Sequence, residues 1–316
     1  KSRTRRRFLI FMVQKMPIAT SEKEAEKPDV WSILKKSAQR AGQGGLAGAA
    51  AMAINVCSLM WIRTTVNYQY RFGTSTTEAF KAIYAQGGIP RFYRGLLPAL
   101  VQGPLSRFGD TAANTGTLVA LDSFDTTKNL PMGIKTVAAS VAAALFRIVL
   151  MPVDTFKTTL QVSGKEGLSQ IFAKFKVKGP SVFWYGSLAA ASATFVGHYP
   201  WFFTYNLLDE KLPKYEDRLS KLARSAVIGF CASAISDTCS NSIRVIKVYK
   251  QANEEAITYP QALKRVLAED GVMGLLGRGL KTKIIANGLQ GLMFSVLWKY
   301  IDELLFKKDK KSNGNH

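Results

Sequence analysis

A short pattern that ends in glycine recurs three times along this chain of 316 residues. Each copy contains a tripeptide that ends in glycine, and another glycine stands seven or eight residues before that last glycine. Self-similarity at a fixed period predicts a repeat architecture, and three repeats of this length fill the chain. The tripeptides are Tyr93-Arg94-Gly95, Trp184-Tyr185-Gly186 and Gly277-Arg278-Gly279, and their last glycines lie 91 and 93 residues apart.

An apolar run that ends in a polar turn precedes the tripeptide in the second repeat. The run Val137–Met151 is followed by Pro152, Asp154 and Lys157. Proline inside a helix removes one hydrogen bond and kinks the helix, and residues three apart share one face. Taken alone, this string is better explained as a helix end with a surface ion pair. A membrane helix that turns at one end to close a cavity is the other interpretation.

Repetition favours the membrane interpretation. The segments Ser58–Asn67 and Ser242–Gln251 lie at the equivalent distance before the other two tripeptides. A basic residue occupies the same place in all three segments, as Arg63, Lys157 and Lys247. A soluble all-helical protein with buried helices is the alternative, and it explains the repeat poorly.

Together the two patterns resemble the repeat of the mitochondrial carrier family over roughly residues 37–306. That repeat reads Pro-x-acid-x-x-base and then, after a loop and a short helix, acid-Gly, four residues and aromatic-base-Gly. The resemblance implies an all-α membrane protein with six transmembrane helices in three pseudo-threefold repeats and three short matrix surface helices. Both termini would lie on the intermembrane-space side, and one central cavity would open alternately to either side.

Five segments follow from this interpretation. Residues 1–21 hold six basic and no acidic residues, a composition typical of a transit peptide or a basic surface helix. We expect spans near 39–62, 98–121 (broken at Gly103-Pro104), 131–151, 188–208, 222–240 and 284–305, with surface helices over 74–86, 168–176 and 259–268. The segments are a basic extension and linker (1–36), repeats 1 to 3 (37–130, 131–215, 216–306) and a polar tail (307–316).

The net charge of +21 limits the choice of partners. Its bases are spread over loops between apolar segments, which favours anionic lipid head groups and anionic solutes over nucleic acid. Cys57, Cys231 and Cys239 lack the spacing of metal ligands. No nucleophile, base and acid stand in a catalytic pattern, so we expect no enzyme activity, no cofactor and no metal.

Polar residues inside membrane spans are functional candidates, because charges are costly there. Alignment of the repeats yields ten candidates for lining the cavity, of which Gln102, Ala193, Thr194 and Asn287 stand at the levels where the resemblance places the family's substrate contact points. Arg147 and Asp237 face each other in this alignment, either as a pair that binds a charged solute or as a buried ion pair that fixes helix register. His198 is either a packed, hydrogen-bonded histidine or a proton relay. The ten residues are Gln102, Ser106, Arg107, Arg147, Ala193, Thr194, His198, Asp237, Asn287 and Gln290.

The family closes its matrix side with three acid–base pairs, and this chain departs from that pattern. Met60 and Arg244 stand where acids are expected, so Asp154 is the single acid among the gate bases. We expect such a gate to stand open at rest or to need a bound anion, because like charges repel. The matrix gate comprises Met60, Arg63, Asp154, Lys157, Gln161, Arg244, Lys247 and Gln251, and the intermembrane-side gate comprises Asp125, Lys128, Asp209, Lys299 and Asp302.

Two functions fit these observations. The first is transport of a small anionic solute across the mitochondrial inner membrane by alternating access through the central cavity. The second is a non-transporting structural or accessory subunit of a respiratory or ATP synthase complex, which the degraded gate favours. Either way the expected partners include the lipid bilayer, with cardiolipin at the N-termini of the surface helices.

Overall fold

The computed structural model describes residues 52–123, 126–291 and 293, and every regular element among them is a helix. The expectation of an all-α protein is therefore confirmed. In chain order the elements are a helix over residues 52–72, α3 (Thr76–Ala85), α4 (Ile89–Phe92), α5 (Leu96–Ser123), α6 (Met132–Val149), α7 (Met151–Ser163), α8 (Glu166–Lys178), the 3₁₀ helix η1 (Gly179–Trp184), α9 (Ser187–Lys211), α10 (Arg218–Ala252), α11 (Tyr259–Gly277) and a helix over residues 280–291.

Local sequence signals set where the surface helices begin. Ser75 caps α3 and Thr258 caps α11, and each forms a capping box with the residue three positions on, Glu78 and Gln261. A capping box satisfies two backbone N–H groups that the first helical turn leaves without partners. In α11 the backbone leaves helical geometry at Gly271, so the part before this kink corresponds to the expected third surface helix and a second helical stretch follows it.

Proline breaks one expected helix and leaves another intact. The third expected span ends at Val149, and α7 begins at Met151 with Pro152 in its first turn and a bend of 64°. The kink predicted at Pro152 is thus confirmed. The break expected at Gly103-Pro104 is wrong, since α5 runs unbroken with Pro104 inside it. Where Ser242 replaces the repeat's proline, α10 continues as one helix of 35 residues.

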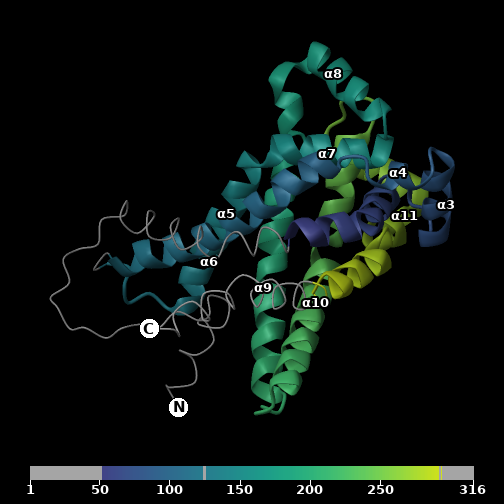
Figure 1. The fold of residues 1–316 in the computed structure, drawn as a ribbon. Coiled ribbons are helices and arrows are strands. Elements are labelled where there is room, and N and C mark those ends of the chain that lie inside the picture. The colour runs from purple at the N-terminus through teal and green to yellow at the C-terminus, as the bar shows by residue number, and fades with distance from the viewer. Residues whose placement is uncertain (1–51, 124–125, 292, 294–316) are drawn as a thin grey trace, which may run out of the picture.

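Two helical hairpins diverge from a common region. Figure 1 shows the pair α5–α6 extending to one side and the pair α9–α10 extending downward, while α4, α7 and α11 lie near the point of divergence. The largest buried cluster lies there and joins all three repeats through Tyr70, Val162, Val248 and Val266. The C-terminal ends of the helix over residues 52–72, of α7 and of α10 therefore meet at one end of the bundle.

Among the described residues, no single helix is both long and apolar enough to cross a membrane. By length and composition, α6 and α7 together are, across their bend of 64°.

Candidate functional site

The three tripeptide glycines join the repeats in a ring. Gly95 packs against α7, Gly186 against α10 and Gly279 against the helix over residues 52–72, so each repeat contacts the next. A Cβ at Gly95 would lie 2.9 Å from the carbonyl oxygen of Lys157, closer than real Cβ contacts allow. The glycines of the motif predicted from the sequence therefore allow close packing between neighbouring repeats, against backbone at Gly95 and Gly279 and against side chains at Gly186.

Buried cations reinforce the same ring. One basic side chain from each repeat donates to backbone carbonyls at the C-terminal end of the next repeat's helix, where a positive charge is stabilising. The three do not occupy equivalent sequence positions, so the repeat pattern gave no sign of them. Arg91 donates to the carbonyls of Gln161 (2.9 Å) and Val162 (2.6 Å), Lys174 to that of Gln251 (3.1 Å), and Arg278 to that of Arg71 (3.3 Å).

Asp154 lies at the centre of the candidate gate. Its buried carboxylate accepts from Lys157 (2.8 Å) in the same repeat and from Lys247 (2.5 Å) in the third repeat. Two amide side chains also donate hydrogen bonds to this carboxylate, Gln102 on α5 at 2.6 Å and Gln251 on α10 at 3.4 Å. We call these five residues the Asp154 junction. One acid thus joins side chains from all three repeats.

The other two gate bases point elsewhere. Arg63 donates to Gln290 (2.5 Å) and Asn55 (3.4 Å), and Arg244 lies 3.8 Å from Asp237. Two of the four bases, Lys157 and Lys247, therefore contact Asp154, and the other two take different partners at the same end of the bundle. Whether closure also needs a bound anion stays a prediction.

The remaining gate residues from the sequence also lie at this end. Gln161 accepts a bond of 2.5 Å from Asn67 and donates to the sulfur of Met60 at 3.5 Å. Asn67, Gln161 and Gln251 each follow their repeat's gate base by four residues, so amide side chains extend the ion pairs by one helical turn.

The proposed pair between Arg147 and Asp237 is not formed. Asp237 is buried, pairs with Arg244 of its own helix and accepts a short hydrogen bond from Asn287. Arg147 donates to Ser106 on α5 at 2.7 Å. The two residues occupy equivalent positions in different repeats, but the bend after α6 and the straight course of α10 give them different neighbours.

His198 takes the packed role. Its Nδ1 lies 2.7 Å from the Ser140 hydroxyl on α6, and its ring meets Phe202 edge-on. Thr194 donates to the carbonyl of Ala190 in its own helix, and Ala193 is fully buried. The Arg107 side chain lies outside the described part of the structure.

The expected intermembrane-side gate is only partly described. Asp209 on α9 forms an ion pair of 2.6 Å with Arg224 on α10, the helix that follows it in the chain. The backbone carbonyl of Lys128 accepts from Lys135, which also pairs with Asp122. Asp125, Lys299 and Asp302 lie outside the described residues. Sequence reasoning missed Asp122 and Lys135, because neither follows the family motif.

Lys283 was also missed, although a spacing signal was present. Lys283, Asn287 and Gln290 stand at positions i, i+4 and i+7 of the helix over residues 280–291, so they share one face. Asn287 and Gln290 were both candidates, and Lys283 extends their face by one turn.

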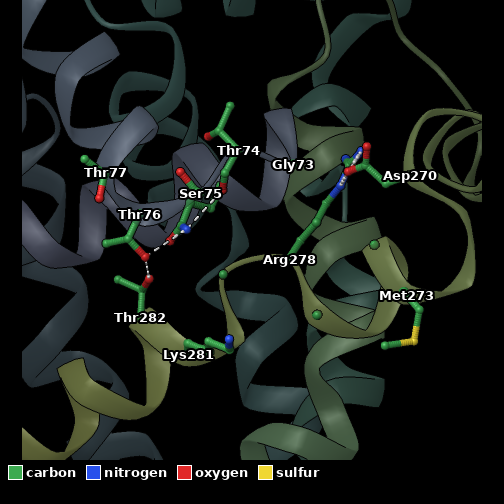
Figure 2. Close-up of a pocket in the computed structure, with 14 residues that line it drawn as sticks. Gly73, Thr74, Ser75, Thr76, Thr77, Asp270, Met273, Arg278, Lys281 and Thr282 are labelled. Atoms are coloured by element: carbon green, nitrogen blue, oxygen red, sulfur yellow. Dashed lines mark hydrogen bonds and ion pairs between the residues drawn. The ribbon is translucent and has the colours of Figure 1, made fainter.

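A pocket of about 640 Å³ lies between α3 and the start of the helix over residues 280–291. Its walls carry the hydroxyls of Thr74, Ser75, Thr76 and Thr77 (Figure 2). Across it, Thr76 and Thr282 share a hydrogen bond of 2.7 Å, and Lys281 and Arg278 supply positive charge, although Arg278 is paired with Asp270. Hydroxyls and cations around one space suit a phosphate head group.

Relatives of known name cover part of the chain. It is 30% identical to "Mitochondrial thiamine pyrophosphate carrier 1" of Meyerozyma guilliermondii over 52% of this chain and 60% of the relative. It is 26% identical to "Mitochondrial RNA-splicing protein MRS3" of Saccharomyces cerevisiae over 45% of the chain and 47% of the relative. It is also 26% identical to "Protein MITOFERRINLIKE 1, chloroplastic" of Arabidopsis thaliana, over 56% of this chain and 43% of the relative. The chain thus spans about half the length of the curated relatives it matches.

A family comparison covers most of the chain. The family described as "Mitochondrial carrier protein" matches three times, over residues 30–114, 128–216 and 219–309. Each match contains one tripeptide glycine and one of the three equivalent bases Arg63, Lys157 and Lys247, so the three matches coincide with the repeats that the packing ring joins. The chain therefore belongs to the mitochondrial carrier family, whose members are multi-pass proteins of the mitochondrial inner membrane.

Proposed function

We propose that this protein transports a small anionic solute across the mitochondrial inner membrane by alternating access through its central cavity. The observation that supports this most is the Asp154 junction, which links the three repeats through side chains. Ion pairs and amide hydrogen bonds break and re-form with less rearrangement than a packed apolar core, so such a junction is suited to a gate.

The charge around the junction favours an anionic solute. Lys157, Lys247, Arg63 and Arg244 lie at the same end of the bundle, against the two carboxylates of Asp154 and Asp237. A cleft lined mainly by one sign of charge raises the local concentration of the opposite sign. One relative is named for a solute that contains a pyrophosphate group, which is itself anionic.

Uptake into proteoliposomes tests the proposal. The full chain would be reconstituted and supplied with labelled anions, and uptake should depend on protein, should saturate and should fall with Asp154→Asn. Glu255→Gln is the control, because Glu255 forms only an exposed pair with Arg265. If no solute enters while the protein is folded and correctly inserted, the transport proposal is wrong.

The alternative is a carrier-fold subunit that does not transport. Met60 favours it, since the first repeat supplies no acid to the junction and its base, Arg63, is bonded to Gln290 and Asn55 instead. A protein of this kind would co-migrate with a respiratory or ATP synthase complex after mild detergent extraction. Migration as a single chain would favour the transporter.

The pocket between α3 and the helix over residues 280–291 is our proposed lipid contact. Cardiolipin carries two phosphates, and the hydroxyl-lined pocket with Lys281 suits one of them. Thermal stability should rise when cardiolipin is added to delipidated protein, and Lys281→Glu should reduce that rise. An equal response to a neutral lipid would contradict the proposal.

A further inference from the structure

Lys283, on the helix over residues 280–291, is a charged residue for which the described part of the structure shows no bonding partner. Its side chain is partly buried, and within the part of the chain that the structure describes its ammonium makes no hydrogen bond and no ion pair. Charged side chains inside membrane spans are rare, and when present they are paired or they bind a solute. An unpaired lysine at such a place calls for a partner from outside the protein.

The face that carries Lys283 points toward the Asp154 junction. One turn further on, Asn287 donates to Asp237 on α10, and the next turn places Gln290 against Arg63. The ammonium of Lys283 interacts electrostatically with Asp237, Arg244, Arg63 and Lys157. Lys283 therefore lies among the charged side chains around the Asp154 junction.

The charges in this region do not balance. Two carboxylates, Asp154 and Asp237, face five cations. Asp154 is bonded by the four other residues of its junction, and Asp237 accepts from Asn287 and lies 3.8 Å from Arg244. Among the described residues, neither carboxylate forms an ion pair with Lys283. Arg244 uses one nitrogen toward Asp237 and one toward Ser240 at 3.2 Å, so other guanidinium N–H groups stay available. The five cations are Arg63, Lys157, Arg244, Lys247 and Lys283.

We propose that Lys283 and Arg244 bind a solute with at least two negative charges. This inference rests on the proposed function and gives its substrate class. A monoanion would leave most of the excess positive charge in a region of low dielectric, where unpaired charge is costly, and a cation would add to it. Two or three negative charges bring the region close to neutrality. Phosphate esters and di- or tricarboxylates share this property.

Calorimetric binding to the purified full chain provides the test. Acetate, malonate, citrate, phosphate and pyrophosphate would be compared at constant ionic strength. We expect the multiply charged anions to bind and acetate not to bind. The relative strength of the phosphates and carboxylates then identifies which of the two chemistries the site prefers.

Variants of Lys283 show whether this side chain is responsible. Loss of one charge-assisted hydrogen bond predicts weaker binding of the best anion by about tenfold to a hundredfold in Lys283→Gln. Lys283→Arg should retain most of the affinity. Lys264→Gln is the matched control, because Lys264 is exposed on α11 and its loss removes the same charge. Without anion, Lys283→Gln should melt at or above the wild-type temperature, since it removes an uncompensated charge.

Three results would contradict the proposed role of Lys283. Anion affinity that is unchanged in Lys283→Gln, a lowered melting temperature of that variant without anion, or equal affinity for acetate would overturn it. Uptake into proteoliposomes separates it from the proposed function. Lys283-dependent binding without any uptake would leave the inference standing and refute transport, whereas uptake that Lys283→Gln does not change would do the reverse.

Discussion

The second and third repeats place opposite charges seven residues apart on equivalent helices, and the structure pairs them differently. In the third repeat, Asp237 and Arg244 lie on one straight helix, where residues two turns apart share a face, and they approach to 3.8 Å. In the second repeat, Arg147 and Asp154 lie on either side of the bend at Leu150. There Arg147 reaches Ser106, and Asp154 reaches Lys157 and Lys247.

This difference shows what the bend contributes. The bend turns an acid that would pair within its own helix toward the neighbouring repeat. It also places Asp154 in the first turn of α7, where the helix dipole stabilises a negative charge. A single backbone break thus converts a local ion pair into a contact between repeats.

Loss of the Asp154 charge should have the largest effect. Asp154→Asn leaves Lys157 and Lys247 buried without a counter-charge, and we expect a loss of about 3–5 kcal/mol in unfolding free energy. Asp154→Asn combined with Lys247→Gln should recover part of it. Thermal and denaturant unfolding in detergent measure the change, with Glu255→Gln as an exposed-pair control that changes stability by less than about 1 kcal/mol. A cost for Asp154→Asn as small as the control would show that the junction is not a buried ion pair.

Transfer of the proline to the third repeat is the second test. Ser242→Pro removes one hydrogen bond inside α10 and introduces a steric clash with the preceding turn, so it should cost about 3 kcal/mol. It should also separate Asp237 from Arg244. Ser242→Ala is the control and should be nearly neutral. If Ser242→Pro is tolerated, α10 already bends in solution and the contrast between the two repeats is weaker than described.

The C-terminal ends of α7 and α10 give a third comparison, because their capping cations differ in chemistry. Arg91 stays charged at α7, whereas burial lowers the pKa of Lys174, near the end of α10, to about 8 from its ordinary 10.5. Between these values the folded protein holds a neutral lysine and the unfolded chain a protonated one, so folding releases a proton and rising pH favours the fold.

Wild-type stability relative to Lys174→Arg should therefore rise by about 1–2 kcal/mol as the pH is raised from 8 to 10. Below pH 8 the difference between the two proteins should be constant. Melting temperatures of both proteins across this range provide the measurement. A difference that does not change with pH would place the Lys174 ammonium in contact with water.

Much of the fold was predictable from the sequence, because it follows from local signals. The repeat period, the capping residues and Pro152 each act over a few residues, and they located most helices to within a few positions. Pro104 was the exception, since α5 absorbs it without a break. The site was less predictable. Asp154 and Lys157 were identified from their spacing, but the partners of Arg147 and Asp237 depend on the bend between helices. The capping roles of Arg91 and Lys174 follow no common sequence position.

Removal of the proline itself should have the smallest effect. Pro152 stands in the first turn of α7, where its missing N–H and fixed φ angle are no disadvantage. Pro152→Ala therefore mainly makes the unfolded chain more flexible, which destabilises by about 0.4–1 kcal/mol. We expect the bend to persist, because the pairs of Asp154 with Lys157 and Lys247 hold α7 in its direction.

Spin labels at the exposed positions of Leu145 and Leu168 report the bend as a distance between α6 and α8. That distance should be the same in the wild type and in Pro152→Ala. It should lengthen when Pro152→Ala is combined with Asp154→Asn, since neither the proline nor the ion pairs then oppose a continuous helix. If Pro152→Ala alone lengthens it, the proline rather than the ion pairs maintains the bend, and the Asp154 junction is a consequence of the kink and not its support.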